Sequence, residues 1–143
     1  MSASSAHARL DAETNSPRIR DRVAQALLLL AALGAAFAVV SAIEAVSDAT
    51  AATRMVETWR LLGFGAFAGL FVLLAYRPRV YAGVWEIVIL NKLCLTLAAF
   101  AYGTEVDGAR TALVADGAIT VMLLTAYVLT HGWRAWSAVR SMA

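Results

Sequence analysis

The chain has 143 residues, of which 61% are hydrophobic and 15% are charged, and its mean hydropathy is +0.69. A soluble domain of this size carries about 25% charged residues, so the composition indicates a membrane protein whose surroundings are the lipid bilayer. Twelve basic and ten acidic residues leave a net charge of +2, which excludes the concentrated positive field of a nucleic-acid-binding protein. The length allows one folded domain.

Charged residues divide the chain into four apolar stretches. The clearest is Val23 to Ile43, which has no charge over 21 residues and reaches about 31 Å as a helix, enough to cross the hydrocarbon core. The other stretches are bounded by Trp59 and Arg77, by Val80 and Thr104, and by Leu113 and Trp133. We therefore predict four transmembrane helices, at residues 23–46, 59–77, 80–103 and 112–133.

The segments outside the spans set the domain boundaries and the orientation. Residues 1–22 are rich in alanine and serine without periodicity, which predicts a disordered tail; residues 23–134 form the transmembrane domain and 135–143 a second tail. Pro78 predicts a hairpin of two or three residues between the second and third spans. Eight arginines lie on the side of this hairpin and of both tails: Arg9, Arg18, Arg20, Arg22, Arg77, Arg79, Arg134 and Arg140.

The opposite side carries three arginines, Arg54, Arg60 and Arg110. Positive residues favour cytoplasmic loops, so both termini are expected in the cytoplasm. The predicted fold is an all-α, integral membrane four-helix bundle with antiparallel up-down topology, located in the inner (plasma) membrane. In size and number of spans the chain resembles small four-span bacterial membrane proteins such as the DoxX-like group, and the resemblance implies this plan and no functional residue.

Small residues recur on the first two spans. Gly34, Ala38 and Ala42 are spaced four residues apart, and Gly65 and Gly69 form a GxxxG pattern. Such surfaces let helix backbones approach closely in lipid. One interpretation is contact between the first and second spans within one bundle, and the other is a homo-oligomer through Gly65 and Gly69 or Gly34 and Ala38.

Three charges, Glu86, Lys92 and Asp116, lie inside the predicted spans. Charged groups at membrane depth face protein or water and are candidates for function. At about 100° per residue, Lys92 shares a face with Thr96, while Asp116 shares one with polar residues of the fourth helix. We predict a Lys92–Asp116 contact between these antiparallel helices.

Polar groups on several faces of the third helix indicate that other helices surround it. At the cytoplasmic end, Glu86 is expected near His131, Arg134 or Arg77. The candidate ligand-binding residues are Lys92, Asp116, Glu86, Asn91, Thr96, Thr120, Tyr127 and His131. The alternative reading makes the charges structural, His131 an interface residue, and Trp59, Trp85, Trp133 and Trp136 an aromatic belt.

Motifs for catalysis are missing from the sequence. It has no Gly-rich phosphate loop, no GxSxG, no HExxH and no histidine set for haem or a catalytic metal. The single cysteine, Cys94, excludes a disulfide within the chain and a multi-cysteine metal site. We therefore assign no catalytic residue, no metal and no cofactor, while a membrane enzyme that uses Glu86, Lys92 and Tyr127 as acid–base groups stays open.

Three hypotheses for function remain open. The first is a small membrane protein that binds or translocates a small solute through a polar site between the third and fourth helices. The second is a non-catalytic membrane scaffold or partner subunit whose buried charges hold helices together. The third is a membrane-embedded enzyme acting on a lipid or quinone. Direct contact between Lys92 and Asp116 without a cavity beside them argues against the first hypothesis.

Overall fold

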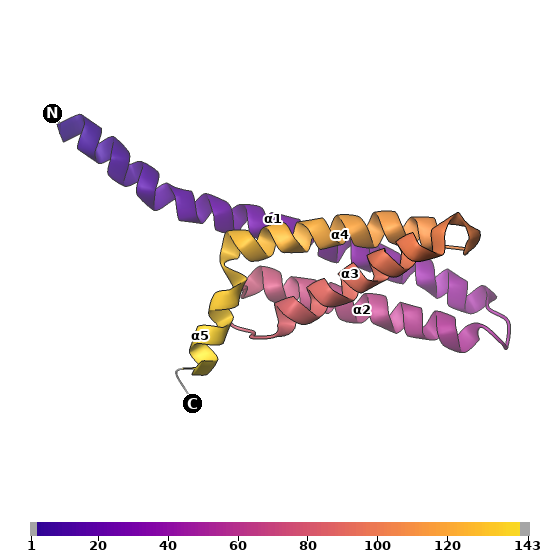
Figure 1. The fold of residues 1–143 in the computed structure, drawn as a ribbon. Helices are drawn as coiled ribbons and strands as arrows, with labels where there is room; N and C mark the ends of the chain where they lie inside the picture. The colour runs from indigo at the N-terminus through magenta and orange to yellow at the C-terminus, as the bar shows by residue number, and fades with distance from the viewer. Residues whose placement is uncertain (1–2, 141–143) are drawn as a thin grey trace.

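A computed structural model describes residues 3–140 of the chain, with side-chain surroundings given for residues 18–137 except Thr104. The described chain is helical and contains no strand. Its elements are α1 (Ala3–Asp48), α2 (Arg54–Tyr76), α3 (Val84–Tyr102), η1 (Gly103–Glu105), α4 (Ala109–Thr130), η2 (Gly132–Arg134) and α5 (Ala135–Arg140) (Figure 1).

Four helices are long and apolar enough to cross a membrane, as the sequence predicts. They are Arg18–Asp48 of α1, with 31 residues, and the whole of α2, α3 and α4, with 23, 19 and 22 residues. At 1.5 Å per residue even the 19 residues of α3 reach about 28 Å, close to the thickness of a hydrocarbon core.

The connection between α2 and α3 is longer than predicted. It covers residues 77–83, so the expectation of a two- or three-residue hairpin at Pro78 is wrong. The Pro78 carbonyl accepts a hydrogen bond from the Trp85 indole at 2.7 Å, and Gly83 at φ 83° precedes α3. A left-handed residue at that point favours glycine, so α3 begins at Val84 and not at Val80.

The helices pack as two pairs, α1 with α2 and α3 with α4, and a contact between α1 and α4 joins the pairs. Helix α1 lies along α2 and also contacts α4, while α3 packs mainly along α4 and touches α2 little (Figure 1). The core joins residues of all four helices, among them Ala24, Leu28, Phe71, Leu74, Trp85, Val88, Leu123 and Ala126. Because α3 crosses from the α2 side to α4, much of its surface is uncovered, and the expectation that other helices surround it is wrong.

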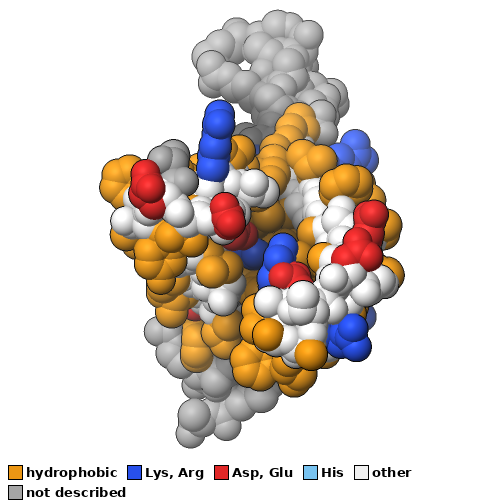
Figure 2. Space-filling model, turned by 90° about the vertical axis from the view of Figure 1, so that its right-hand side faces the viewer, with side chains coloured by type: hydrophobic (Ala, Val, Ile, Leu, Met, Phe, Trp, Pro, Cys, Tyr) orange, Lys and Arg blue, Asp and Glu red, His pale blue; other side chains and the backbone are white. Residues whose placement is uncertain are grey.

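The bundle has two distinct ends. We call the end with residues 18–22, 77–83 and 131–137 the terminus end, and the end with residues 49–53 and 103–108 the loop end. Figure 2 views the loop end and shows charged side chains across this end, with hydrophobic side chains around the flanks. This distribution fits helices whose flanks face lipid and whose ends face water.

Both predicted tails contain helix. Helix α1 begins at Ala3, and Asp21 within it forms an ion pair with Arg79, so the disorder predicted for residues 18–22 is wrong. Residues 1–2 lie outside the described residues, and so do the side chains of residues 3–17. At the other end, α5 occupies residues 135–140, and Ala135 is buried.

The glycines of the small-residue patterns face outward. Gly34, Gly65 and Gly69 are exposed, and a Cβ atom built on each meets nothing within 4 Å. The buried small residues of α1 are alanines, and only Ala42 among them belongs to the predicted pattern: Ala24, Ala31, Ala32, Ala35 and Ala42. The first two spans do pack along each other, as one interpretation expects, but these three glycines make no close contact there.

Candidate functional site

The predicted contact between Lys92 and Asp116 is present. Lys92 Nζ lies 2.7 Å from Asp116 Oδ1, and the two side chains are 5% and 14% exposed. The ammonium group also lies 4.4 Å from the centre of the Phe67 ring on α2, within the range of a cation–π interaction. This lysine therefore joins α3 to α4 through its charge and contacts α2 through the aromatic face.

The hydroxyl groups beside this ion pair bond to their own helices. Thr96 Oγ1 donates to the Lys92 carbonyl at 2.8 Å, and Thr120 Oγ1 donates to the Asp116 carbonyl at 2.7 Å. A Cβ atom on Gly117 would lie 3.5 Å from the Thr96 methyl group, so α3 and α4 are in close contact here. The polar stripe predicted on the two helices is thus satisfied within the protein.

A second polar group forms at the terminus end. Glu86 Oε1 accepts one hydrogen bond from the Tyr127 hydroxyl and one from the Trp136 indole, each at 3.0 Å. None of the described polar contacts of Glu86 is with His131, Arg134 or Arg77, so the expected partners are wrong. The turn after Thr130 brings Trp136 back over the start of α3, and Tyr127 reaches the same carboxylate from α4.

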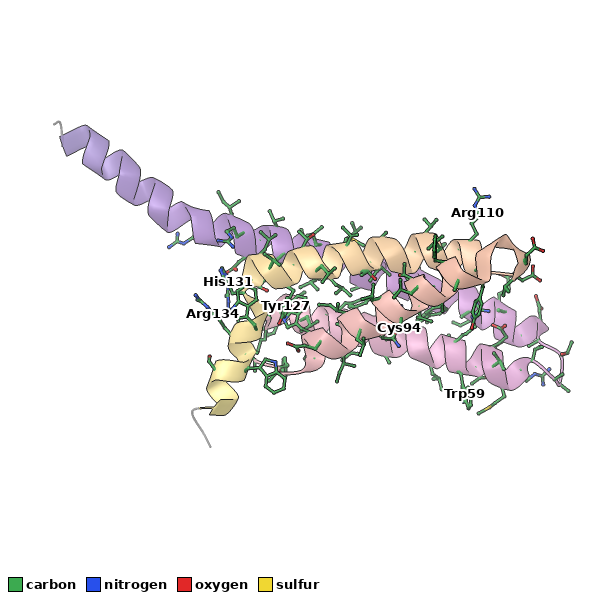
Figure 3. All side chains as sticks on the ribbon, viewed as in Figure 1. Trp59, Cys94, Arg110, Tyr127, His131 and Arg134 are labelled. Atoms are coloured by element: carbon green, nitrogen blue, oxygen red, sulfur yellow. The ribbon has the colours of Figure 1, made fainter. Side chains whose placement is uncertain are left out.

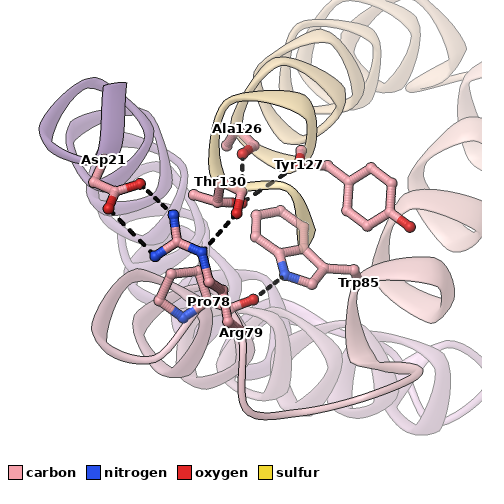
Figure 4. A network of polar contacts seen from close by, with 7 residues as sticks. All are labelled: Asp21, Pro78, Arg79, Trp85, Ala126, Tyr127 and Thr130. Carbon is pink, nitrogen blue, oxygen red and sulfur yellow. Dashed lines mark hydrogen bonds and ion pairs between the residues drawn. The ribbon is translucent and has the colours of Figure 1, made fainter. Parts of the chain in front are cut away.

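Arg79 links three parts of the chain at this end (Figure 4). Its guanidinium group pairs with both carboxylate oxygens of Asp21 on α1, at 2.6 and 3.3 Å, and its Nε donates to the Thr130 carbonyl at 2.8 Å. The carbonyls of the last helical turn lack partners within the helix, so Arg79 caps α4 while it holds α1. Helical spacing in the sequence does not predict either of these contacts of Arg79.

Trp85 is the centre of an aromatic group next to this link. It is 1% exposed, so its expected place in an interfacial aromatic belt is wrong. Its ring contacts Tyr127 in an edge-to-face arrangement at 5.5 Å, and Tyr127 contacts Trp133 at 5.7 Å. Gly132 lies against this group, because a Cβ atom there would overlap Tyr127 Cδ2 and come within 2.7 Å of its Cε2.

His131 ends α4 in the left-handed conformation, with φ 53° and ψ 50°. Its ring stacks edge-to-face with Trp133 at 5.0 Å. Loss of solvation lowers the pKa of His131 below its ordinary value of 6.5, and the charges of Arg134, Arg20 and Arg79 lower it further. Figure 3 shows His131 at the terminus end, near Tyr127 and Arg134.

The eight candidate residues do not form one site. Lys92 and Asp116 pair in the middle of the bundle, Glu86 and Tyr127 pair at the terminus end, and Asn91 is exposed on α3. Two surface depressions lie elsewhere. One is an apolar groove of about 520 Å³ between α1 and α2, and the other, of about 350 Å³, adjoins Arg110 on α4. Among the described residues, no three His, Cys, Asp or Glu side chains cluster as metal ligands.

Comparisons with protein-family models, with curated proteins and with solved structures found no match for this chain.

Proposed function

We propose that this protein is an integral membrane protein with four antiparallel spans and cytoplasmic termini, and that it serves as a non-catalytic scaffold or partner subunit. The arginines support this orientation, because Arg20, Arg22, Arg77, Arg79 and Arg134 all belong to the terminus end. Arginine-rich ends favour the cytoplasm.

The proposal rests on one observation: the charged side chains inside the spans have partners within the protein. The Lys92 ammonium is paired with Asp116 at 2.7 Å, and the Glu86 carboxylate accepts two hydrogen bonds from within the protein. A buried charge is costly until it is paired. These contacts give the side chains a structural role, because each one joins two parts of the protein. A solute site instead needs donors, acceptors or charges that are free to bind the solute.

The outer surface of α1 and α2 supports the role of a partner subunit. Leu33 and Leu62 are 68% and 65% exposed there, and the 520 Å³ groove is lined by Leu29, Ala32, Leu33, Ala36, Ala68, Gly69 and Val72. Helices in lipid associate through close packing at small residues. Gly65 and Gly69 on α2, with Gly34 on α1, leave room for another helix, from a second copy or from a different protein.

Native mass spectrometry of the intact protein, released from detergent, tests the proposal against a solute site. The variant Lys92→Met/Asp116→Leu removes both charges of the pair. The matched control, Arg60→Met/Glu57→Leu, removes the exposed ion pair of α2, whose side chains are 56% and 20% exposed.

We expect the wild type and both variants to differ only by the masses of the substitutions. A small molecule or ion that stays bound to the wild type and the control, and is absent from the Lys92/Asp116 variant, would contradict the proposal. It would support solute binding, or an enzyme acting on a lipid or quinone if the bound molecule is one of these.

A further inference from the structure

We infer that the uncovered face of α3 around Asn91 is an interface with a second copy of this chain. Asn91 is exposed, and it lies about 10 Å along the helix from Val84 and about 16 Å from Tyr102 at 1.5 Å per residue. It is thus well inside the hydrocarbon region when α3 spans the membrane. The inference goes beyond the proposed function, because it names the partner and uses a different face of the protein.

The amide of Asn91 has no partner within the described chain. The side chains of α3 that make polar contacts are Trp85, Glu86, Lys92 and Thr96. Asn91 is about 100° around the helix from Lys92, so it points away from the bundle interior. An amide without a hydrogen bond is unfavourable in hydrocarbon, and in membranes asparagine commonly bonds across to another helix.

The chemistry of this face identifies a second copy as the occupant. A primary amide has both donors and an acceptor, so two asparagines related by a two-fold axis satisfy each other, as a self-complementary interface requires. The neighbours on the same face carry no charge. Ile87 and Leu95 are 66% and 43% exposed, and Cys94 is exposed and small, which allows the two backbones to approach.

Cys94 makes the interface testable without an introduced probe. It is the single cysteine of the chain, it lies midway along α3 (Figure 3), and it is about 60° from Asn91 on the helical wheel. In a dimer through this face the two Cys94 thiols come close together. Copper phenanthroline with oxygen removes two protons and two electrons from the two thiols and leaves one disulfide.

The experiment treats membranes containing the full chain with this oxidant and measures the disulfide-linked dimer on a non-reducing gel. We expect a dimer from the wild type, and a dimer fraction reduced on the order of tenfold in Asn91→Leu, as for the loss of an interhelical amide contact. Asn91→Gln should retain the dimer. The matched control Thr125→Leu, at an exposed position of α4, should leave it unchanged.

Co-purification of two differently tagged copies gives a second readout that does not use the cysteine. We expect the second copy with wild-type protein and its loss with Asn91→Leu. Failure of both cross-linking and co-purification in the wild type would overturn the inference. So would a dimer that persists in Asn91→Leu, or a different protein recovered through Asn91 in place of a second copy. None of these outcomes affects the test of the Lys92–Asp116 pair.

Discussion

Removing Lys92 alone should destabilise the protein far more than removing Lys92 and Asp116 together. The atoms Nζ and Oδ1 are 2.7 Å apart, and at an effective dielectric constant of 20 the Coulomb attraction is about 6 kcal/mol. Desolvation of both groups offsets much of that attraction. Losing one partner leaves the other charge buried, which costs about 3–5 kcal/mol.

The expected shifts in melting temperature follow from these free energies. For a chain of this size 1 kcal/mol corresponds to about 2–4 °C, so Lys92→Met and Asp116→Leu should each lower Tm by about 6–20 °C. The double variant should lie near the wild type or above it, because apolar replacements of a buried pair are often neutral or stabilising. The exposed Glu57–Arg60 pair contributes about 0–1 kcal/mol, so its double variant is the control.

Thermal unfolding in a mild detergent, followed by circular dichroism, measures all four corners of this double-mutant cycle. We expect a coupling energy of at least about 3 kcal/mol between Lys92 and Asp116. If the double variant lost as much stability as the sum of the two single variants, the pair would not hold the bundle and the reasoning would be refuted.

Three further predictions concern the terminus end. Gly132→Ala should cost about 1–3 kcal/mol through overlap with the Tyr127 ring. The control Gly63→Ala, where a Cβ atom meets nothing within 4 Å, should not lower Tm, and equal losses from the two variants would contradict the packing described. Arg79→Gln should lower Tm more than Asp21→Asn, because it also removes the hydrogen bond that caps the Thr130 carbonyl, worth about 0.5–1.5 kcal/mol. Equal decreases in Tm for the two variants would mean that Arg79 stabilises the protein only through the ion pair, and would contradict the capping role. His131 should titrate below pH 6.5 in the folded protein, since its pKa is lowered. The unfolded chain then binds the proton more readily, so the free energy of unfolding decreases as the pH falls below 6.5. Ring chemical shifts against pH measure this, with Arg134→Gln expected to raise the value, and a pKa at or above 6.5 in the wild type would contradict the expectation.

The sequence predicts the features that depend only on the spacing of residues along one helix. Charges at known positions divide the chain into four apolar segments, and the structure has a helix in each. Antiparallel neighbours place Lys92 and Asp116 at similar depths, so their contact follows from helical geometry and from the cost of an unpaired buried charge.

The sequence does not predict contacts that depend on the path of the connections. Trp136 reaches Glu86 only because the chain turns at His131 and Gly132, and Arg79 reaches Asp21 only because the connection 77–83 is seven residues long. Helical spacing gives the direction of each side chain relative to its own axis, and it does not say which face another helix covers. For this reason the orientation of Gly65 and of Asn91 had to come from the structure.

The accessibility of Lys92 to an amine-specific reagent tests the central claim most directly, because Lys92 is the single lysine of the chain. Intact protein in lipid bilayers is treated with a small membrane-permeant acetylating reagent, and mass spectrometry follows modification of Lys92 against the same protein unfolded in hot dodecyl sulfate. A closed ion pair predicts strong protection in the folded wild type and faster modification in Asp116→Asn. Modification of the folded wild type at the rate of the unfolded chain would show an open, water-filled site and contradict the account.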